Sequence, residues 1–255
     1  GSDLAALGLA ARRDGDHYVL NGSKIWTTHA HHANWMFALV RTDRSGKPQT
    51  GITFLLIPMD TPGLRVDPII FVSGEHEVNA VFFDDVRVPV SLRVGVENDG
   101  WTVAKYLLEF ERGGGNAGPG LEAAAQRLHR LAEDHGVALP QGTLATLEVT
   151  IEAVKTLEFR ILSALGQGQN PGPESSMLKT LAGQARQQLS ELTVSLLGPT
   201  ALGGAAAPAP RGASAEVAAA SATAAARYFN YRALSIAGGT DEVQRDIIAK
   251  RVLGL

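Results

Sequence analysis

The hydrophobic period of the chain changes near Gly100, and this change divides the chain into two kinds of structure. Before it, short apolar runs are separated by polar, glycine or proline breaks, which is the pattern of β-strands. The runs that predict strands are residues 17–20, 35–40, 52–57 and 78–83. From Gly100 onward, apolar residues recur at helical spacing. The predicted helices cover residues 101–110, 120–135, 141–165, 174–197 and 214–235. The sequence therefore predicts a compact β domain over residues 1–95 and a helical bundle over residues 96–255.

The composition permits a folded protein of one or two domains and argues against several functions. With 255 residues, 45% of them hydrophobic, the chain can bury a sizeable core. The 23 Lys and Arg against 26 Asp and Glu give a formal charge of −3, so nothing favours nucleic acid or an anionic membrane as a partner. The lack of cysteine rules out disulfides and thiolate chemistry and fits a reducing cytoplasm. No apolar run approaches the length of a membrane span and no secretory signal opens the chain. We therefore expect a cytoplasmic protein that does not insert into membranes.

The last eighteen residues join a flexible glycine pair to a well-marked helix start. Gly238 and Gly239 let the backbone come close to a ligand, and Thr240 is a good N-cap residue. Asp241 and Glu242 suit the positive end of the helix dipole. The apolar residues that follow recur at helical spacing, which predicts one buried face. They are Val243, Ile247, Ile248 and Val252. The exposed N–H groups of the first turn can face an anionic cofactor, although an ordinary capped terminal helix fits the same residues.

Three collinear stretches resemble the flavin-dependent acyl-CoA dehydrogenases. The first joins Gly-Ser-Asp-Leu-Ala at residues 1–5 to Asn-Gly-Ser-Lys-Ile-Trp-Thr-Thr at residues 21–28. The second is Phe-Phe-Asp-Asp-Val-Arg-Val-Pro at residues 82–89, and the third begins with Gly-Gly-Thr-Asp-Glu-Val-Gln-Arg at residue 238. The resemblance covers the whole chain, most loosely at residues 139–226. It implies an α+β fold, in which an antiparallel barrel-like or sandwich domain precedes an up-and-down helical bundle. It also implies that the family's N-terminal helical domain is absent ahead of Gly1, where a Gly-Ser cloning remnant would look the same.

The resemblance implies that the protein holds FAD. A Trp beside two hydroxyl residues offers a flat apolar surface for an isoalloxazine ring and donors for its polar edge. The resemblance accordingly places Trp26 against the ring, Thr28 at its N5 atom and Thr27 beside it. It places Ser2 near the flavin pyrophosphate and extends the cofactor site to the terminal motif, namely Gly238, Gly239, Thr240 and Glu242. Without the resemblance, a Trp in a strand is more often a core residue.

The reaction of the family needs a carboxylate base, because the α-proton of the acyl-CoA leaves to a base while the β-hydrogen leaves as hydride to the flavin. A buried Glu suits this work, because burial raises its pKa. Many family members place this Glu just before the Gly-Thr of the terminal motif, but here that residue is Gly238, which cannot act. Others place it on the first long helix of the C-terminal domain, just before an arginine, and Glu111 with Arg112 matches that pattern. We therefore predict Glu111 as the base and Arg112 as its structural or electrostatic support. A solvated Glu-Arg pair on a helix face is the alternative.

A histidine cluster follows the candidate flavin strand. Alternation would place His29 and His31 on one face of a strand, with His32 next to them. Without cysteine and without a separated fourth ligand, zinc is disfavoured. We therefore expect a solvated or hydrogen-bonded turn and no metal site.

The resemblance also implies partners. The family acts on acyl-CoA substrates and passes electrons to an electron-transferring flavoprotein, and its members are homo- or hetero-oligomers. The Ala-rich stretch at residues 218–226 would permit close packing of a neighbouring helix or subunit. The Arg-x-x-Phe-Gly stretch that holds the flavin adenosine in the family has no counterpart after Arg112. The alternatives are therefore a companion subunit that is non-catalytic or shares its flavin, an oxidase on the same fold, and a truncated fragment with little activity of its own.

Overall fold

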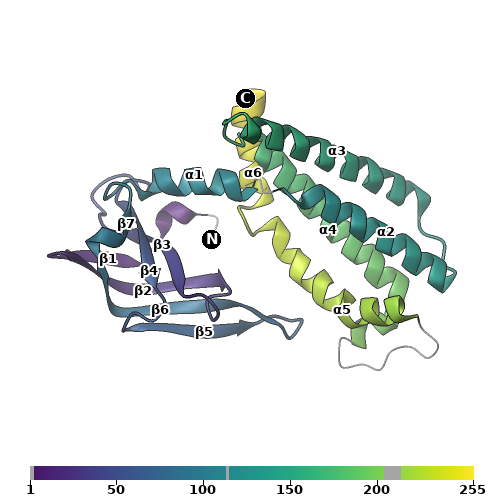
Figure 1. Ribbon diagram of the computed structural model, residues 1–255, viewed down its shortest axis with the longest axis horizontal. Coiled ribbons are helices and arrows are strands. Elements are labelled where there is room, and N and C mark those ends of the chain that lie inside the picture. The colour runs from purple at the N-terminus through teal and green to yellow at the C-terminus, as the bar shows by residue number, and fades with distance from the viewer. Residues whose placement is uncertain (1–2, 113–114, 204–213) are drawn as a thin grey trace. The chain divides into compact units, whose positions relative to one another are not determined.

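The computed structural model describes residues 3–112, 115–203 and 214–255 (Figure 1). The chain divides into two compact units, Gly1–Leu108 and Glu109–Leu255. In the described residues, the first unit carries the strands and the second consists of helices, so the predicted α+β class is confirmed. The predicted domain boundary between residues 95 and 96 stays a prediction, because helix α1 (Gly100–Arg112) runs across the division between the two compact units.

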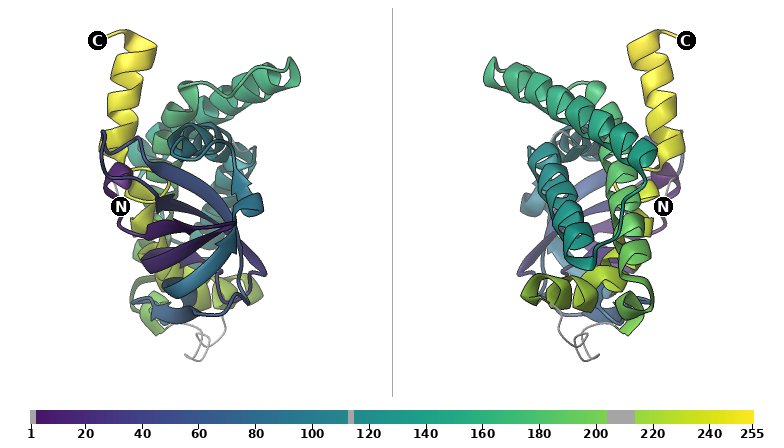
Figure 2. Two further views of the ribbon diagram at one scale, coloured as in Figure 1. Left: turned by 90° about the vertical axis from the view of Figure 1, so that its left-hand side faces the viewer. Right: turned by 90° about the vertical axis from the view of Figure 1, so that its right-hand side faces the viewer.

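The first unit is built on one mixed sheet. Its described strands are β1 (Ala10–Asp14), β2 (His17–Thr28), β3 (Trp35–Arg41), β4 (Ile52–Pro58), β5 (Leu64–Ile70), β6 (His76–Pro89) and β7 (Arg93–Val94). Their order across the sheet is β5-β6-β2-β1-β3-β4-β7. The pairings are antiparallel except between β1 and β3, which meet in parallel at Ala10 and Arg41. The strands twist relative to one another across the sheet (Figure 2).

The sheet buries apolar side chains on both faces where β3 and β4 run. One face carries the main core, which includes Tyr18, Leu20, Val40, Leu55, Ile57, Val81, Val86 and Val88. On the other face, Leu39, Ile52 and Phe54 pack against Ala104 of α1. The near-continuous burial of β4 follows, because a strand that is covered on both faces needs apolar residues at successive positions.

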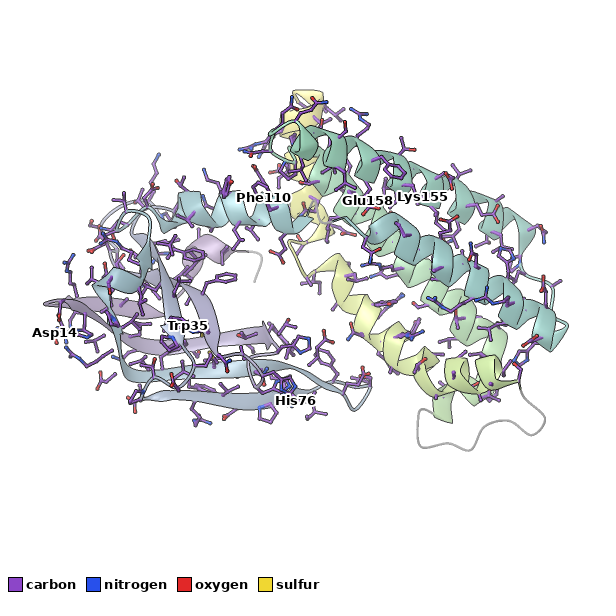
Figure 3. All side chains as sticks on the ribbon, in the orientation of Figure 1. Asp14, Trp35, His76, Phe110, Lys155 and Glu158 are labelled. Atoms are coloured by element: carbon purple, nitrogen blue, oxygen red, sulfur yellow. The ribbon has the colours of Figure 1, made fainter. Side chains whose placement is uncertain are left out.

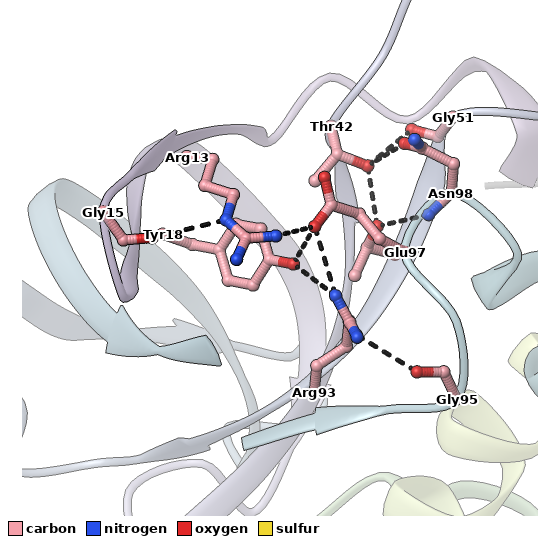
Figure 4. Close-up of polar contacts among 10 residues, drawn as sticks. Arg13, Gly15, Tyr18, Thr42, Gly51, Arg93, Gly95, Glu97 and Asn98 are labelled. Carbon is pink, nitrogen blue, oxygen red and sulfur yellow. Dashed lines mark hydrogen bonds and ion pairs between the residues drawn. The ribbon is translucent and has the colours of Figure 1, made fainter. Parts of the chain in front are cut away.

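A polar network fastens the loop before α1 to the sheet (Figure 4). The Tyr18 hydroxyl donates to Glu97 Oε2 at 2.5 Å, and Arg13 Nη1 donates to the same oxygen at 2.9 Å. Arg93 Nη1 lies 3.2 Å from both the Tyr18 hydroxyl and Glu97 Oε2. Three donors from β1, β2 and β7 therefore converge on one carboxylate oxygen, and they hold the pKa of Glu97 below its ordinary value, with the hydrogen bond from Tyr18 as the largest cause.

The second unit is a helical bundle. Its described α-helices beyond the end of α1 are α2 (Ala117–His135), α3 (Gln141–Gly166), α4 (Glu174–Leu197), α5 (Ala215–Tyr231) and α6 (Asp241–Ile248). Short helical turns occupy Gly198–Gly203, Arg232–Ser235 and Ala249–Leu253 in this unit, and Leu4–Ala6 and Val90–Leu92 in the first unit. The core of the bundle joins α2, α3 and α4 through residues such as Leu121, Leu128, Leu147, Ile151, Val154, Leu178 and Leu189. None of the helices in the part of the chain that the structure describes is long and apolar enough to cross a membrane.

Helix α3 supplies the cap of its neighbour α2. Both oxygens of Glu158, which is only 4% exposed, accept backbone hydrogen bonds from the first turn of α2. Ala117 N donates to Oε1 at 2.7 Å, and Gly118 N donates to Oε2 at 2.9 Å. Figure 3 shows Glu158 and its neighbour Lys155 on α3. This carboxylate caps the helix in place of the N-cap residue, because the side chain of Asn116 at the cap position makes no capping hydrogen bond.

Candidate functional site

Strand β2 departs from regular pairing where the sequence places the candidate flavin residues. Between Lys24 and Thr27 its register against β6 shifts, which marks a β-bulge. Trp26, inside the bulge, has a φ of 63°, which is uncommon for a bulky residue. It is 59% exposed, and its neighbour Ile25 is 60% exposed. Trp26 is therefore not a core residue. Its backbone conformation costs about 1–3 kcal/mol, and such strain is typical of positions that serve a ligand.

The end of β2 is fixed by a buried asparagine on β6. Asn79, which is fully buried, donates from Nδ2 to the Thr27 carbonyl at 3.0 Å. Its Oδ1 lies 2.7 Å from His76 Nε2. Beyond it, Thr28 is exposed and the backbone N–H of His29 donates to the Glu77 carbonyl at 2.9 Å. Trp26 and Thr28 are thus exposed to solvent, on a backbone that is fixed by the hydrogen bonds from Asn79 and to Glu77.

Lys24 connects the same strand to β3 through its partly buried side chain. Its Nζ donates to the Leu39 carbonyl of β3 at 2.6 Å. Burial lowers the pKa of Lys24 from 10.5 to about 8, because the charged amine is removed from water without a carboxylate partner. The amine crosses to β3 beyond the start of β1, which begins at Ala10 opposite Asn21. Lys24 therefore replaces the missing strand contact at this point of the sheet.

The histidine cluster lies in a turn. Strand β2 ends at Thr28 and His29 has a φ of 54°, so the expected turn is confirmed and His29 and His31 do not share a strand face. His31 stacks on His76 with ring centroids 3.9 Å apart, and its pKa is lowered by burial and by the neighbouring imidazoles of His32 and His76. Across residues 3–112, 115–203 and 214–255, no group of three or more His, Cys, Asp or Glu has a geometry that could hold a metal ion.

Glu111, the predicted base, lies in the last turn of α1 and is exposed. The described residues of its unit therefore do not supply the burial that we expect for the base. Glu109, two residues earlier, is half-buried, and its Oε1 lies 3.9 Å from Arg251 Nη1. The side chain of Arg112 and the whole of Ser2 lie outside the described residues.

The terminal motif forms the predicted capped helix. Gly238 and Gly239 have φ values of 68° and 94°, in the left-handed region that favours glycine. Thr240 Oγ1 accepts a hydrogen bond from Val243 N at 3.2 Å, which confirms it as the N-cap residue of α6. The two glycines thus let the chain turn directly before an exposed helix N-terminus, whose first backbone N–H groups have no partner within the helix.

The acidic residues of this first turn leave its positive end available. Asp241 pairs with Lys179 of α4 at 2.9 Å, with both side chains mostly buried. Glu242 has a side chain that is 79% exposed, and it lies 3.7 Å from Arg245. Because one carboxylate is already neutralised by a lysine and the other points into solvent, an anion could approach the helix N-terminus.

The predicted apolar face of α6 is only partly correct. Its one fully buried residue in the described structure is Gln244, which donates from Nε2 to the Gly238 carbonyl at 3.3 Å. Val243, Ile247 and Ile248 are half-buried, and Val252 is 39% exposed. The difference arises because polar contacts anchor the helix start, through Gln244 to the glycine turn and through Asp241 to α4. Gln244 Oε1 has no hydrogen-bond partner among the described residues, and such a buried acceptor costs about 1–3 kcal/mol.

Sequence reasoning missed three residues that support the candidate site, namely Asn79, Lys179 and Gln244. Lys179 interrupts an apolar stretch of α4, and a lone cation in such a stretch is a detectable signal of a buried partner. Asn79 and Gln244 act through partners that only the fold brings near, so the sequence carries no local signal for them.

Both units match models of known domains. Residues 1–86 match the acyl-CoA dehydrogenase middle domain, and residues 98–253 match the acyl-CoA dehydrogenase C-terminal domain. Among similar curated proteins, the acyl-CoA dehydrogenase IpdE1 of Mycobacterium tuberculosis is 35% identical over 264 residues. That alignment covers 100% of this chain and 64% of IpdE1, so the chain spans about two thirds of the length of this relative.

Solved structures agree with these matches. The Tcur3481-Tcur3483 steroid ACAD has a TM-score of 0.83 and 29% identity, covering 100% of this chain and 65% of that chain. The ChsE4-ChsE5 complex from Mycobacterium tuberculosis has a TM-score of 0.81 and 29% identity, covering 100% of this chain and 66% of that chain. The fold described above is therefore similar to that of these proteins in both units.

Proposed function

Since the chain belongs to the acyl-CoA dehydrogenase family, we propose that the protein oxidises an acyl-CoA thioester to the trans-2-enoyl-CoA with FAD. We further propose that the electrons pass to an electron-transferring flavoprotein. The main support for this proposal is the conformation of Trp26. The residue is exposed and has a strained backbone on a β-bulge, which suits a surface that contacts a ligand and does not suit a core residue. The proposal extends to a cytoplasmic protein that works as a homo- or hetero-oligomer.

The described residues fit a flavin. Trp26 offers an exposed ring, the Thr28 hydroxyl lies nearby on the same strand, and the backbone beneath them is held by Asn79. Gly238, Gly239, Thr240 and Glu242 belong to a helix N-terminus that suits a pyrophosphate. The cofactor set that we propose also includes Thr27 and Ser2. When bound, the flavin supplies the acceptor for the β-hydrogen, which leaves the acyl chain as hydride.

Glu111 is the residue that we propose to take the α-proton, with Arg112 as its support. The electron pair of the broken α-C–H bond becomes the second bond of the new C=C, and the proton rests on the Glu111 carboxylate. A carboxylate surrounded by water is a weak base, and desolvation raises its pKa toward that of the substrate. Glu111 is exposed in its unit, so the proposal requires the bound thioester or a further segment to cover it.

A companion subunit of a two-chain enzyme is the second candidate function. The exposure of Glu111 favours it, as does the absence of an Arg-x-x-Phe-Gly sequence after Arg112. Two of the similar solved structures are named as pairs, ChsE4-ChsE5 and Tcur3481-Tcur3483. In this role the chain would keep the fold and share or lack the flavin.

The visible absorption spectrum of the purified protein tests the proposal, followed by anaerobic addition of fatty acyl-CoA and steroid-derived CoA thioesters. A flavin band that bleaches with one thioester supports the dehydrogenase. Glu111→Gln should then keep the flavin band and slow the bleaching at least 100-fold, as expected for loss of a general base. Glu109→Gln, two residues earlier on the same helix, is the matched control and should bleach normally. A colourless protein that acquires flavin only with a second chain would favour the companion subunit, and one that never binds flavin would overturn the dehydrogenase proposal.

A further inference from the structure

Helices α2, α4 and α5 enclose a pocket that the proposed reaction does not use. The pocket lies within the second unit and has a volume of about 540 Å³. This is in the range of cavities that hold small organic ligands. Its lining comes from all three helices, so the pocket belongs to the bundle itself and not to a loop.

The floor of the pocket is apolar. Leu128 and Leu131 of α2 and Leu189 of α4 line it, and all three are buried. Helix α5 contributes alanines where larger side chains would fill the space, among them Ala220 and Ala224. Because the side chains of α5 that line the pocket are small, they leave space among the three helices. An aliphatic group could be buried there.

Each of the three helices adds one arginine to this lining. Arg127 comes from α2, Arg186 from α4 and Arg227 from α5. None of the three makes an ion pair or a side-chain hydrogen bond with another residue in the described part of the chain. By contrast, Arg232 nearby is satisfied, since its Nη2 donates to the Gln187 carbonyl at 2.9 Å and its guanidinium lies over the Tyr228 ring.

Three arginines thus line one pocket in a chain whose formal charge is −3. Arg186 is half-buried, and Arg127 and Arg227 are exposed at the pocket's edge. Their planar N–H donors match the geometry of an oxyanion such as a carboxylate or a phosphate. The apolar leucines and the arginines together favour a ligand that has an apolar body and an anionic group.

We propose that this pocket binds an amphipathic anion, with an aliphatic body against the leucine floor and a carboxylate or phosphate held by Arg127, Arg186 and Arg227. The lining contains none of the residues assigned to the flavin or the base. The inference goes beyond the proposed dehydrogenase and does not depend on it, because its test measures binding and not turnover.

Calorimetric titration of the chain with octanoate, octyl phosphate and 1-octanol tests the proposal. Octanoate and octyl phosphate share the aliphatic body and differ in the anion, so their relative affinities identify which head group the arginines prefer. We expect at least one of them to bind at least tenfold more tightly than 1-octanol, with affinity that falls as salt increases. Equal binding of the neutral alcohol, or no binding of either anion, would overturn the proposal.

Two variants localise the site. Arg186→Gln should weaken binding of the preferred anion at least tenfold, whereas Arg160→Gln, which removes an exposed arginine from α3 outside the pocket, should leave it unchanged. Gly120→Leu places a large side chain in the lining, and its Cβ would meet no atom within 4 Å. It should also weaken binding while the circular dichroism spectrum stays native. Unchanged affinity in a folded Gly120→Leu protein would show that the anion binds elsewhere and would contradict the proposal.

Discussion

Lys179 of α4 and Asp241 of α6 form an ion pair at 2.9 Å, with side chains that are 13% and 14% exposed. The pair is a long-range contact of the terminal motif. It fixes the first turn of α6 to helix α4, which begins more than sixty residues earlier in the sequence. Asp241 also lies directly after Thr240, the N-cap of the same helix. Together with the Gln244 contact to the glycine turn, this mostly buried charge pair therefore fixes the position of the candidate anion-binding N-terminus.

Removal of the lysine should destabilise the second unit. Lys179→Met leaves Asp241 without its partner in a mostly buried position, and we expect a loss of about 3 kcal/mol in the free energy of unfolding by urea. The double variant Lys179→Met with Asp241→Leu should recover most of this loss, because no unpaired charge remains. Lys250→Met is the control, since its pair with Asp246 has side chains that are 66% and 59% exposed, and its effect should stay below about 1 kcal/mol. Equal losses in both single variants would contradict the importance of burial.

Glu158 provides a second prediction for the same unit. Glu158→Ala removes the acceptor of the Ala117 and Gly118 N–H groups, so the first turn of α2 loses its cap. We expect about 2 kcal/mol of destabilisation, the upper range for loss of a helix cap. Glu152→Ala, an exposed glutamate on the same helix α3, should cost much less. Hydrogen exchange at the start of α2 would locate the effect, and protection there equal to the parent protein would argue against the cap.

Much of this fold follows from local sequence pattern, and the parts that do not are instructive. The apolar runs at residues 17–20, 35–40, 52–57 and 78–83 all lie within strands, because alternating or continuous burial leaves a visible period. Strand β1, which reads Ala-Ala-Arg-Arg-Asp, shows no such period. Strand β5 contains Pro68, which is tolerated because β5 lies at the edge of the sheet.

The same division holds for the candidate site. The cap at Thr240 and the left-handed glycines before it depend on neighbouring residues, so the sequence predicts them. The bulge at Trp26 depends on how β2 meets β6, and the burial of Gln244 depends on how α6 meets α4. Pairing across the chain decides these features, and no local pattern records them.

Gly100 supplies a prediction about the first unit. A Cβ at this position would lie 2.6 Å from the Phe54 backbone nitrogen and 2.7 Å from the Thr53 carbonyl carbon, so helix α1 begins in backbone contact with β4. Gly100→Ala should therefore cost about 2 kcal/mol or more despite the better helix propensity of alanine. Gly120→Ala in α2, which meets no atom within 4 Å, is the control and should be neutral or stabilising. Thermal unfolding of both variants measures the contrast.

The network around Glu97 predicts a loss of stability in acid. The pKa of Glu97 is lowered in the folded chain from its ordinary value of 4.5, first by the hydrogen bond from Tyr18 and then by Arg13 and Arg93. A depressed carboxyl pKa contributes stability that is present above the unfolded pKa and is lost as pH falls through the folded pKa. Below about pH 5 the unfolding free energy should thus fall less steeply with decreasing pH in Glu97→Gln than in the parent protein. Parallel slopes in this window would show that Glu97 titrates alike in both states.

Lys24 predicts a second rise of stability with pH, in the alkaline range. Burial lowers its folded pKa from 10.5 to about 8, so between these values the unfolded chain binds more protons than the folded chain. Because stability rises with pH wherever the unfolded state binds more protons, the unfolding free energy should increase between about pH 8 and pH 10. The rise from this one group is of order 2–3 kcal/mol, at about 1.4 kcal/mol per pKa unit. Lys24→Met should abolish the rise, because methionine does not titrate. The variant also loses the hydrogen bond to the Leu39 carbonyl, but that loss changes stability equally at every pH and leaves the slope unaffected.

Urea unfolding at half-unit pH intervals, with Lys105→Met as the exposed control, measures the slope. A rise that persists in Lys24→Met would assign the titration to another group and leave Lys24 charged in the folded protein.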